Sequence, residues 1–311
     1  MQNIAIIGSG FCGVSIAKKI NPGFADVVIY DKGKRPGGRV ASKTFSNRIY
    51  DYGPAFIPSS LTKDLTVEES IERQLWPNEA SNSFIPFGGV SSFTEQLANG
   101  IKSYQDCQVI KCLRKEQTFS LVLKENSIVE DIDILVVTAP SEQSAELIKD
   151  ISPNLSDEIR QTVMMAPTWV VLLETQQIIE LDPLLKVNSE IVKNIRSEHT
   201  KLGRRSDNGG SWFVIECSDQ WSQTNVEKPP KWVIETIINW FRNDLALDFS
   251  INAATAHRWR YASTKLPLSK DFLRDASGDL WIAGDWCLGN GIVSAVRSGK
   301  VVGDKINSEL K

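Results

Sequence analysis

The residue types with the clearest chemistry lie at the start of the chain, in a glycine-rich loop and an acid that follows it. Gly8, Gly10 and Gly13 come directly after an apolar run, and Asp31 ends the next apolar run. Glycines at this spacing make a tight turn, let a backbone approach a pyrophosphate, and let a helix pack closely on a strand. A carboxylate at Asp31 suits hydrogen bonds to ribose hydroxyls. These residues predict a dinucleotide site rather than a purely structural turn.

The elements around this loop form a predicted βαβ unit. Residues 4–7 and 27–30 are apolar enough for buried parallel strands, and residues 14–20 are expected to form the helix between them. The diphosphate would then lie at the helix N-terminus, where free N–H groups and the helix dipole favour negative charge. Phe11 and Cys12, within the turn, belong to the candidate cofactor site with the glycines.

A second glycine pair narrows the choice of dinucleotide. Gly37, Gly38 and Arg39 follow closely after Lys32. Such a pair lets the chain pass close over a pyrophosphate, and the guanidinium adds an ionic partner for it. Nicotinamide-dependent Rossmann enzymes do not need this extension. The pattern therefore favours FAD, with a solvated basic loop as the alternative.

A further candidate site lies near the C-terminal end of the sequence. Residues 280–283 form an apolar run that leads into Gly284 and Asp285, and a helix is expected to start near Gly291 and Ile292. An acid directly after Ala-Gly suits a bond to a ribityl hydroxyl. A helix N-terminus here would direct its N–H groups at the N1–C2=O edge of a flavin and stabilise the anion formed on reduction.

The composition of the whole chain limits its class. Its 311 residues allow about two domains, and 41% hydrophobic with 23% charged residues is ordinary for a soluble globular protein. A net charge of −3 without a long basic run argues against nucleic acid as a partner. We see no secretory signal or membrane-spanning run, so we expect a cytoplasmic monomer or homodimer without membrane partners. The five scattered cysteines indicate reduced thiols and no metal site.

The middle of the chain has a different pattern from its two ends. It contains strand-like runs and one amphipathic helix, at residues 169–174, 191–196, 211–217, 254–261 and 231–243. We therefore expect an α/β fold, in which an α+β substrate domain is inserted into a Rossmann-like FAD-binding domain. The FAD-binding domain would comprise residues 1–60, 88–160 and 263–311, and the substrate domain residues 61–87 and 161–262.

Three candidate catalytic residues alternate along one predicted strand. His257, Trp259 and Tyr261 should face one side of it, and Arg258 and Arg260 the other. One interpretation is a wall of the substrate pocket with His257 as a polar contact. The other is a packed aromatic face, with the arginines in salt bridges.

A short basic segment also has two interpretations. Arg196, Lys201, Arg204 and Arg205 would suit the phosphates of a nicotinamide dinucleotide substrate. A solvated basic loop would have the same composition.

Taken together, these motifs resemble those of the renalase-like branch of the flavin amine oxidase superfamily, whose members are FAD-binding proteins of the GR2 type. Residues 200–204, 221–222 and 257–262 resemble that branch in particular. The resemblance implies the amine oxidase architecture, which is p-hydroxybenzoate hydroxylase-like, with non-covalent FAD. It also implies oxidation of isomeric dihydro-NAD(P), or a related small reductant, by hydride transfer to flavin N5. Oxygen would then accept the electrons, giving hydrogen peroxide.

The same resemblance implies further cofactor contacts. Gly53, Pro54 and Ala55 would pass beside the isoalloxazine ring, and Ala139 would close the nucleotide domain. Val109 would offer its backbone to the adenine. A plain core valine is an equally good interpretation, because a backbone contact demands no particular side chain.

Asp31 replaces the commoner glutamate, and Cys287 suggests either a covalent flavin link or a packed thiol, of which we expect the thiol. The rival functions are an amine oxidase acting on a small amine and a non-catalytic flavin-binding protein. A carotenoid- or porphyrinogen-type dehydrogenase is disfavoured by the short chain and by the lack of a membrane-binding helix.

Overall fold

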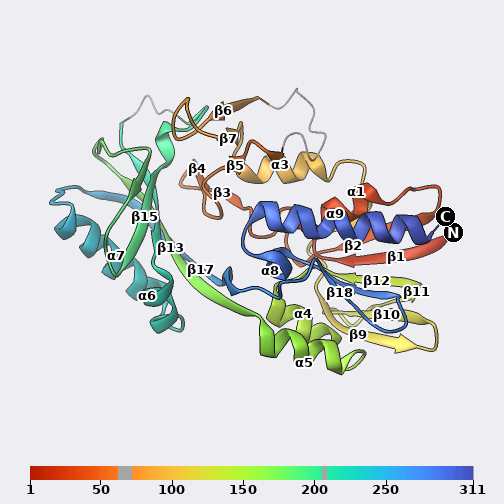
Figure 1. Ribbon diagram of the computed structural model, residues 1–311. Helices are drawn as coiled ribbons and strands as arrows, with labels where there is room; N and C mark the ends of the chain where they lie inside the picture. The colour runs from red at the N-terminus through yellow and green to blue at the C-terminus, as the bar shows by residue number, and fades with distance from the viewer. Residues whose placement is uncertain (62–71, 205–208, 311) are drawn as a thin grey trace. The chain divides into compact units, whose positions relative to one another are not determined.

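The computed structural model describes residues 1–61, 72–204 and 209–310, and the chain divides into two compact units (Figure 1). The first unit comprises Met1–Gly38, Thr94–Met165 and Thr264–Lys311, and the second comprises Arg39–Phe93 and Ala166–Ser263. Residues 39–60 and 88–93, which we expected in the FAD-binding domain, therefore belong to the second unit. Their side chains make buried contacts there, as described below for Tyr50 and Asp51.

The centre of the first unit is a six-stranded sheet with strand order β18-β19-β12-β1-β2-β8. Its strands are β1 (Gln2–Ile7), β2 (Ala25–Tyr30), β8 (Ser103–Tyr104), β12 (Ile134–Val137), β18 (Leu273–Arg274) and β19 (Leu280–Ile282). The strands pair in parallel, except that β18 runs antiparallel to β19. Both faces of a parallel sheet are buried, which is why its strands are continuous apolar runs. The predicted Rossmann-like α/β sheet is thus confirmed.

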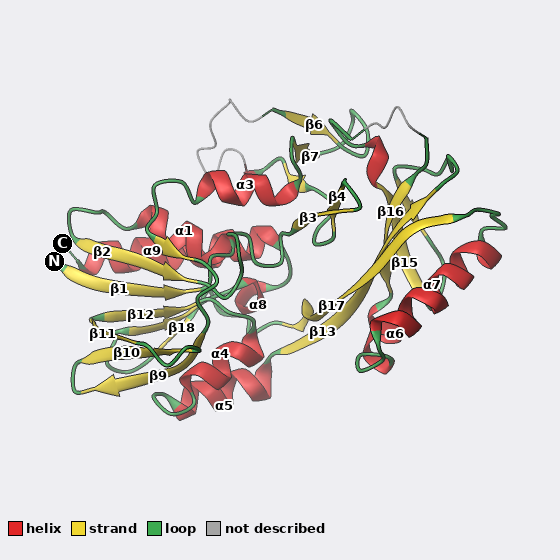
Figure 2. Ribbon diagram, turned by 180° about the vertical axis from the view of Figure 1, so that it is seen from behind, coloured by secondary structure: helices red, strands yellow, loops and turns green. Residues whose placement is uncertain are grey.

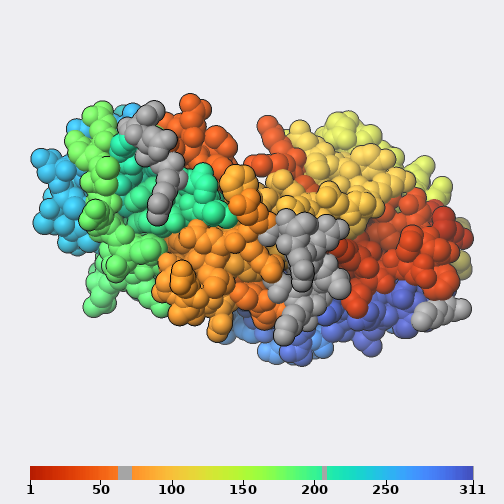
Figure 3. Space-filling model, turned by 90° about the horizontal axis from the view of Figure 1, so that it is seen from above, coloured from red at the N-terminus to blue at the C-terminus, as the bar shows by residue number. Residues whose placement is uncertain are grey.

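Two helices pack side by side in the first unit, α1 (Phe11–Lys19) and α9 (Ile292–Glu309), as Figures 1 and 2 show. In the space-filling view the N-terminal part of the chain, red, adjoins the C-terminal part, blue, on the surface of this unit (Figure 3). Glycines on α9 allow this close approach. A Cβ at Gly299 would lie 2.5 Å from the carbonyl oxygen of Cys12, and Gly303 faces α1 one turn later.

The remaining elements of the first unit are a three-stranded antiparallel sheet and three helices. They are β9 (Val109–Lys115), β10 (Thr118–Leu123), β11 (Ile128–Ile132), α4 (Ser141–Ile148), α5 (Pro153–Thr162) and α8 (Asp285–Leu288). The Cys107 amide donates to the carbonyl of Asp31 at 2.7 Å, and β9 begins two residues later, at Val109.

The second unit is built on a five-stranded sheet with strand order β14-β15-β16-β13-β17. Its strands are β13 (Met164–Thr175), β14 (Leu184–Lys186), β15 (Val192–Ser197), β16 (Trp212–Cys217) and β17 (Ile251–Leu266). The four strand-like runs of the middle of the chain are therefore confirmed. The last of them, β17, is longer than the predicted run of residues 254–261. It lies at the edge of the sheet, and most of its residues are half-buried.

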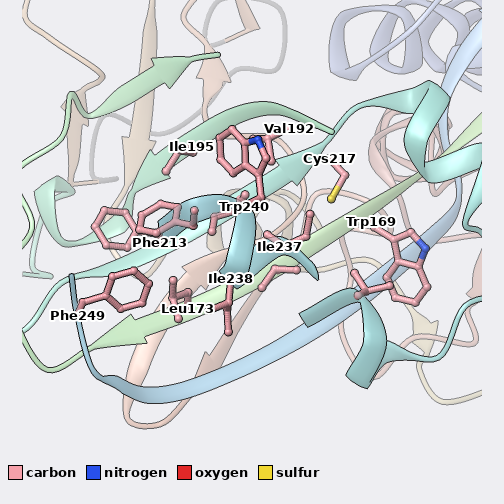
Figure 4. Packing of buried hydrophobic residues seen from close by; sticks show 14 of the residues in the cluster. Trp169, Leu173, Val192, Ile195, Phe213, Cys217, Ile237, Ile238, Trp240 and Phe249 are labelled. Atoms are coloured by element: carbon pink, nitrogen blue, oxygen red, sulfur yellow. The ribbon is translucent and has the colours of Figure 1, made fainter. Parts of the chain in front are cut away.

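The two faces of this sheet pack against different elements. Helices α6 (Asp219–Thr224) and α7 (Pro230–Asp244) cover one face (Figures 1 and 2), and Figure 4 shows Ile237, Ile238 and Trp240 of α7 within that core. Side chains of β13 alternate between the faces, so that Leu173 belongs to this core and Leu172 to a smaller one on the other face. The amphipathic helix predicted from the sequence is confirmed as α7.

The open face of the sheet meets a β-hairpin formed by β3 (Ser42–Phe45) and β4 (Arg48–Asp51). Tyr50 is fully buried in the smaller core with Leu172 and Trp212. The other elements of this unit are β5 (Ile57–Pro58), β6 (Arg73–Leu75), β7 (Ser83–Pro86), the start of α3 (Val90–Leu97), and a 3-10 turn η1 (Glu198–Thr200). Within the described residues, no helix combines the length and apolar character needed to cross a membrane.

Candidate functional site

The glycine-rich loop of the first unit has the geometry that a dinucleotide loop requires. Gly8 has φ +112° at the tight turn, and a Cβ there would lie 2.6 Å from Thr138 Oγ1. A Cβ at Gly13 would clash with the carbonyl oxygen of Gly8, so this glycine permits α1 to pack on β1. A Cβ at Gly10, in contrast, would meet no atom within 4 Å. The space over Gly10 is therefore open to a ligand, and the turn and packing glycines surround it.

The N-terminus of α1 offers backbone N–H groups beside this open space. Gly10 is its N-cap, with no side-chain cap and no acid in the first turn. Phe11 and Cys12 follow with buried side chains, so they present their backbone rather than their side chains to the loop. Burial raises the pKa of the Cys12 thiol far above its usual value, with a smaller contribution from Asp285. The helix end therefore suits an anion.

Asp31 ties the loops after β1 and β2 together. Its carboxylate accepts hydrogen bonds from the Ser9 amide at 2.5 Å, from the Ser9 hydroxyl at 2.9 Å, and from the Gly33 amide at 2.6 Å. The acid thus lies at the end of β2 beside the glycine-rich loop, where the motif predicts a ribose contact.

The second glycine pair lies over the first loop, as the sequence predicts. The Gly37 amide donates to the carbonyl of Ser9 at 3.0 Å. A Cβ at Gly38 would lie 3.5 Å from the Cα of Gly10, and Gly38 has φ +58°. Two glycine loops therefore come together beside the N-terminus of α1, the arrangement that backbone binding of a pyrophosphate requires.

The C-terminal motif forms a second uncapped helix end in the first unit. Gly291 is the N-cap of α9, with φ +90° and no side-chain cap, and a Cβ there would meet no atom within 4 Å. Its amide lies 3.4 Å from a carboxylate oxygen of Asp285, which is buried at the start of α8 directly after Gly284. Ile292 is buried as the first residue of α9. This arrangement suits the ribityl and ring contacts predicted for Asp285 and Gly291.

Cys287 is a packed thiol in the structure. It is fully buried, and burial raises the pKa of its thiol well above the usual value. Nearby Cys12 raises this pKa further, whereas a hydrogen bond with Ser298 lowers it. A protonated, buried thiol is unreactive. This agrees with the expected packed thiol.

The other predicted cofactor contacts of the first unit have partners within it. Lys32 donates to Gln143 at 3.1 Å on the surface. The carbonyl of Ala139 accepts from the indole N–H of Trp286 at 3.0 Å. Val109 is buried and begins β9, so its side chain packs as a core valine. The adenine contact proposed for its backbone stays a prediction.

In the second unit, the Gly53 segment is held by close backbone contacts. A Cβ at Gly53 would clash with the carbonyl oxygen of Arg39, and the Gly53 carbonyl accepts from Arg196 Nη1 at 2.7 Å. Arg39 itself donates to the carbonyl of Ala262 at 3.2 Å. Arg196 is buried, so it fixes this segment rather than facing solvent. Pro54 and Ala55 follow as half-buried residues.

The basic segment after Arg196 is a buried ion cluster, which contradicts the solvated loop. Lys201 Nζ lies 3.0 Å from Asp51 and 2.6 Å from Glu198, and Arg204 pairs with the same two carboxylates. The exposed fractions are 0% for Asp51, 0% for Glu198, 1% for Lys201 and 5% for Arg204. Burial alone would raise the pKa of Asp51, but Lys201 and Arg204 hold it far below its usual value.

The ion cluster also removes these charges from substrate binding. A hollow of about 430 Å³ is lined by residues 200–203 and Gln74. Lys201 is part of this lining, but its ammonium group is already paired with Asp51 and Glu198. The two cations balance the two carboxylates, so no net charge remains for a phosphate. The phosphate interpretation is therefore wrong for Lys201 and Arg204, and Arg205 lies outside the described residues.

An aromatic cluster brings two of the predicted catalytic residues together. The rings of Tyr52 and Trp259 stack at 5.2 Å, and His257 meets Tyr52 at 4.9 Å and Trp259 at 4.3 Å. The indole N–H of Trp259 donates to the carbonyl of Tyr52 at 2.9 Å. In the described part of the chain, the Tyr261 ring makes no such contact with the cluster.

The alternation along β17 is confirmed by the residues on its other side. Arg258 and Arg260 both pair with Glu227, at 2.8 Å and 2.7 Å. Their face therefore belongs to the salt-bridged surface, and the face of His257 and Trp259 belongs to the aromatic cluster.

The electrostatics of the cluster come from burial and one lysine. Burial, with a smaller contribution from nearby Lys43, lowers the pKa of His257 from 6.5 to about 4. Lys43 Nζ lies 5.4 Å from the centre of the Tyr52 ring and 5.8 Å from that of Phe45. The imidazole is therefore neutral at pH 7. No sequence signal marked Lys43 or Tyr52, except that Tyr52 precedes Gly53.

Metal ligation finds no support in the part of the chain that the structure describes, where no group of three or more His, Cys, Asp or Glu residues could hold a metal ion. The first unit presents loop backbones and helix ends, and the second unit presents aromatic rings. Such groups bind and orient an organic cofactor and its substrate, and the redox chemistry would come from the cofactor.

Comparison with known sequences agrees with the N-terminal motif. Residues 6–67 match the family described as NAD(P)-binding Rossmann-like domain. Over 147 residues the chain is 29% identical to coproporphyrinogen III oxidase of Staphylococcus aureus (strain NCTC 8325 / PS 47), a match that covers 43% of this chain and 31% of that protein. The match thus spans about a third of the length of this curated relative.

Solved structures with the same fold cover the whole chain. A protein of Exiguobacterium sp. 255-15 assigned as a protoporphyrinogen oxidase aligns with TM-score 0.76 and 11% identity over 99% of each chain. Cyclohexylamine oxidase from Brevibacterium oxydans IH-35A aligns with TM-score 0.75 and 13% identity, again over 99% of each. The chain therefore has the fold of amine and protoporphyrinogen oxidases.

Proposed function

We propose that this chain is an FAD-dependent oxidoreductase of the renalase type. The observation that carries the choice of FAD is the position of the second glycine pair, because a Cβ on Gly38 would lie only 3.5 Å from the Cα of Gly10. A nicotinamide site on a Rossmann fold needs the first glycine loop but not the second. The open space over Gly10 and the uncapped end of α1 complete a cradle for a pyrophosphate.

The residues of the first unit then have distinct binding roles. Asp31 would accept the adenosine ribose hydroxyls, and the α1 N-terminus would bind the pyrophosphate. Asp285 would accept a ribityl hydroxyl, and the α9 N-terminus, beginning after Gly291, would stabilise negative charge on the pyrimidine edge of the flavin. When bound, FAD supplies the hydride acceptor at N5, and its electrons pass to O2 to give H2O2.

We propose the second unit as the substrate domain. Arg196 clamps the carbonyl of Gly53, which positions the segment proposed to lie beside the isoalloxazine ring. His257 and Trp259 would form the pocket wall, with Tyr261 further along the same strand. We propose isomeric dihydro-NAD(P), or a related small reductant, as the donor.

An amine oxidase is the second candidate function. It is favoured by the fold shared with cyclohexylamine oxidase and with a putrescine oxidase variant, the latter at TM-score 0.72 and 12% identity. A non-catalytic flavin-binding protein is the third candidate.

An anaerobic titration of the purified protein separates these functions by the absorbance of the oxidised flavin. The donors are 6-dihydro- and 2-dihydro-NAD(P), ordinary NADPH, and a panel of primary and secondary amines. Bleaching by the isomers alone, with peroxide formed on readmitting air, is the result we expect. Bleaching by an amine would assign the protein to the amine oxidases, and no bleaching by any donor would contradict the catalytic proposal.

A further inference from the structure

The aromatic cluster of the second unit contains a cation without an anionic partner. Lys43 is half-buried on β3, and no carboxylate of the described residues lies within 4 Å of its ammonium group. Among the described residues, its ammonium group interacts with the rings of Phe45 and Tyr52 and lies near the imidazole of His257. A lysine that is partly removed from water usually has a carboxylate partner. In the described part of the chain, Lys43 instead has ring faces and a neutral imidazole as neighbours.

His257 also has unused hydrogen-bonding capacity. Across the described residues, neither ring nitrogen of His257 has a hydrogen-bond partner, although the ring is held between Tyr52 and Trp259. A neutral imidazole can donate one hydrogen bond and accept another. Trp259, in contrast, has its indole N–H bonded to the carbonyl of Tyr52. The tryptophan therefore acts as a fixed wall, and the histidine remains available to a ligand.

The charges around the cluster distinguish between classes of ligand. The acids of the ion cluster, Asp51 and Glu198, are already neutralised by Lys201 and Arg204. In the β3–β4 hairpin, Lys43 pairs with Tyr50, and the next pair is Ser42 with Asp51. Because successive side chains of a strand point to opposite faces, Asp51 and Lys43 lie on opposite faces of the hairpin. Glu174, whose cross-strand neighbour Trp212 belongs to the same core, pairs with Arg48 at 3.2 Å. A protonated amine would therefore meet Lys43, while these three carboxylates are already paired with cations. An anionic group would meet a cation and a hydrogen-bond donor beside stacked rings.

We propose that Lys43 and His257 bind an anionic group of the substrate, and that the stacked Tyr52 and Trp259 support its flat part. The inference rests on the proposed function, since it assigns a substrate class to the same site. It selects planar, anionic reductants over amines. The anion is either a phosphate, as in a pyridine nucleotide, or a carboxylate, as in an acidic ring compound, because both accept from an ammonium and an imidazole N–H.

The test uses four small probes on the FAD-loaded protein. Nicotinic acid carries a carboxylate, nicotinamide mononucleotide a phosphate, nicotinamide no anion, and benzylamine a cation. Dissociation constants come from the perturbation of the flavin spectrum and from the imidazole NMR signal of His257. Neither readout requires turnover, so a failure of binding is distinguished from a failure of the oxidase activity.

We expect at least one of the two anionic probes to bind about 10- to 100-fold more tightly than nicotinamide, the contribution of one charge-assisted hydrogen bond. Lys43→Met should abolish this preference, and Lys43→Arg should retain most of it. Lys186→Met, which removes an exposed lysine of β14 in the same unit, is the matched control and should leave the preference unchanged. The probe that gains affinity identifies the anion as a phosphate or a carboxylate.

Two results would overturn the inference. One is equal affinity of the wild-type protein for nicotinamide and both anionic probes, or tighter binding of benzylamine. The other is a preference for anions that survives in Lys43→Met with normal FAD content. Should Lys43→Met lose FAD, the comparison of Lys43→Gln with Lys43→Arg decides in its place, because both keep a long polar side chain.

Discussion

Replacing Lys201 with methionine should destabilise the second unit through the buried ion cluster. The lysine is fully enclosed with the carboxylates of Asp51 and Glu198, at 3.0 Å and 2.6 Å. Without it, two buried carboxylates would share the single guanidinium of Arg204, which leaves one uncompensated negative charge. The cluster connects β4 to the turn after β15, so its disruption should also loosen the hairpin that carries Tyr52.

The size of the effect follows from the cost of breaking a buried pair. Removing one partner of such a pair costs about 3–5 kcal/mol. Because Arg204 still faces both acids, we expect the lower end, about 3 kcal/mol, for Lys201→Met. Adding Glu198→Gln restores charge balance, and the glutamine oxygen can still accept from the Asp51 amide. The double variant should therefore be more stable than Lys201→Met by about 1 kcal/mol or more.

Urea unfolding followed by tryptophan fluorescence measures these differences, because Trp76 and Trp212 are buried in the same unit. Lys231→Met, at an exposed position of α7, is the control and should change stability by less than about 0.5 kcal/mol. A loss below about 1 kcal/mol for Lys201→Met would refute the role given to the cluster. Additive losses in the double variant would refute the charge-balance argument.

Three further predictions follow from the site. By NMR, His257 should titrate at about 4, and Lys43→Met should raise this value. The imidazole of His257 binds its proton more readily in the unfolded chain than in the folded one. The His257 contribution to stability is therefore complete above about pH 6.5 and is lost as the pH falls towards about 4. Measuring the urea midpoint as a function of pH tests this. By urea unfolding, Gly13→Ala should destabilise by about 1–3 kcal/mol through its clash, whereas Gly10→Ala should be nearly neutral yet weaken FAD binding. Gly299→Val should lower the urea midpoint more than either, because it separates α9 from α1.

The first unit was predictable because its determinants are local. The glycine spacing specifies a turn, an open cradle and a close packing contact within residues 8–13, and an acid at the end of β2 completes the motif. Buried parallel strands are continuous apolar runs and can be recognised singly. The element boundaries were less accurate: the helix predicted over residues 14–20 spans Phe11–Lys19 in the structure.

The second unit was less predictable because its key contacts join distant residues. The segment around Lys201 has the composition of a solvated loop, and only the fold brings Asp51 to it. Glu198 lies within the same segment, yet nothing in the sequence shows that all four groups are buried. Lys43 has no motif of its own, and it becomes a candidate only once its cross-strand neighbours are known. The alternation of His257 and Trp259 was visible, but the choice between core and pocket was not.

The most direct test of the account is a titration of the flavin-free protein with FAD, FMN and NAD+, followed by flavin and tryptophan fluorescence. The account predicts one FAD per chain, with FMN and NAD+ each binding at least about 100-fold more weakly, since neither can use both glycine loops and the α9 end. Asp31→Ala should weaken FAD binding about 10- to 100-fold, and Asp26→Ala, an acid on the same strand paired with Lys102, should not. Binding of NAD+ as tight as that of FAD, or FAD binding unaffected by Asp31→Ala, would contradict the account.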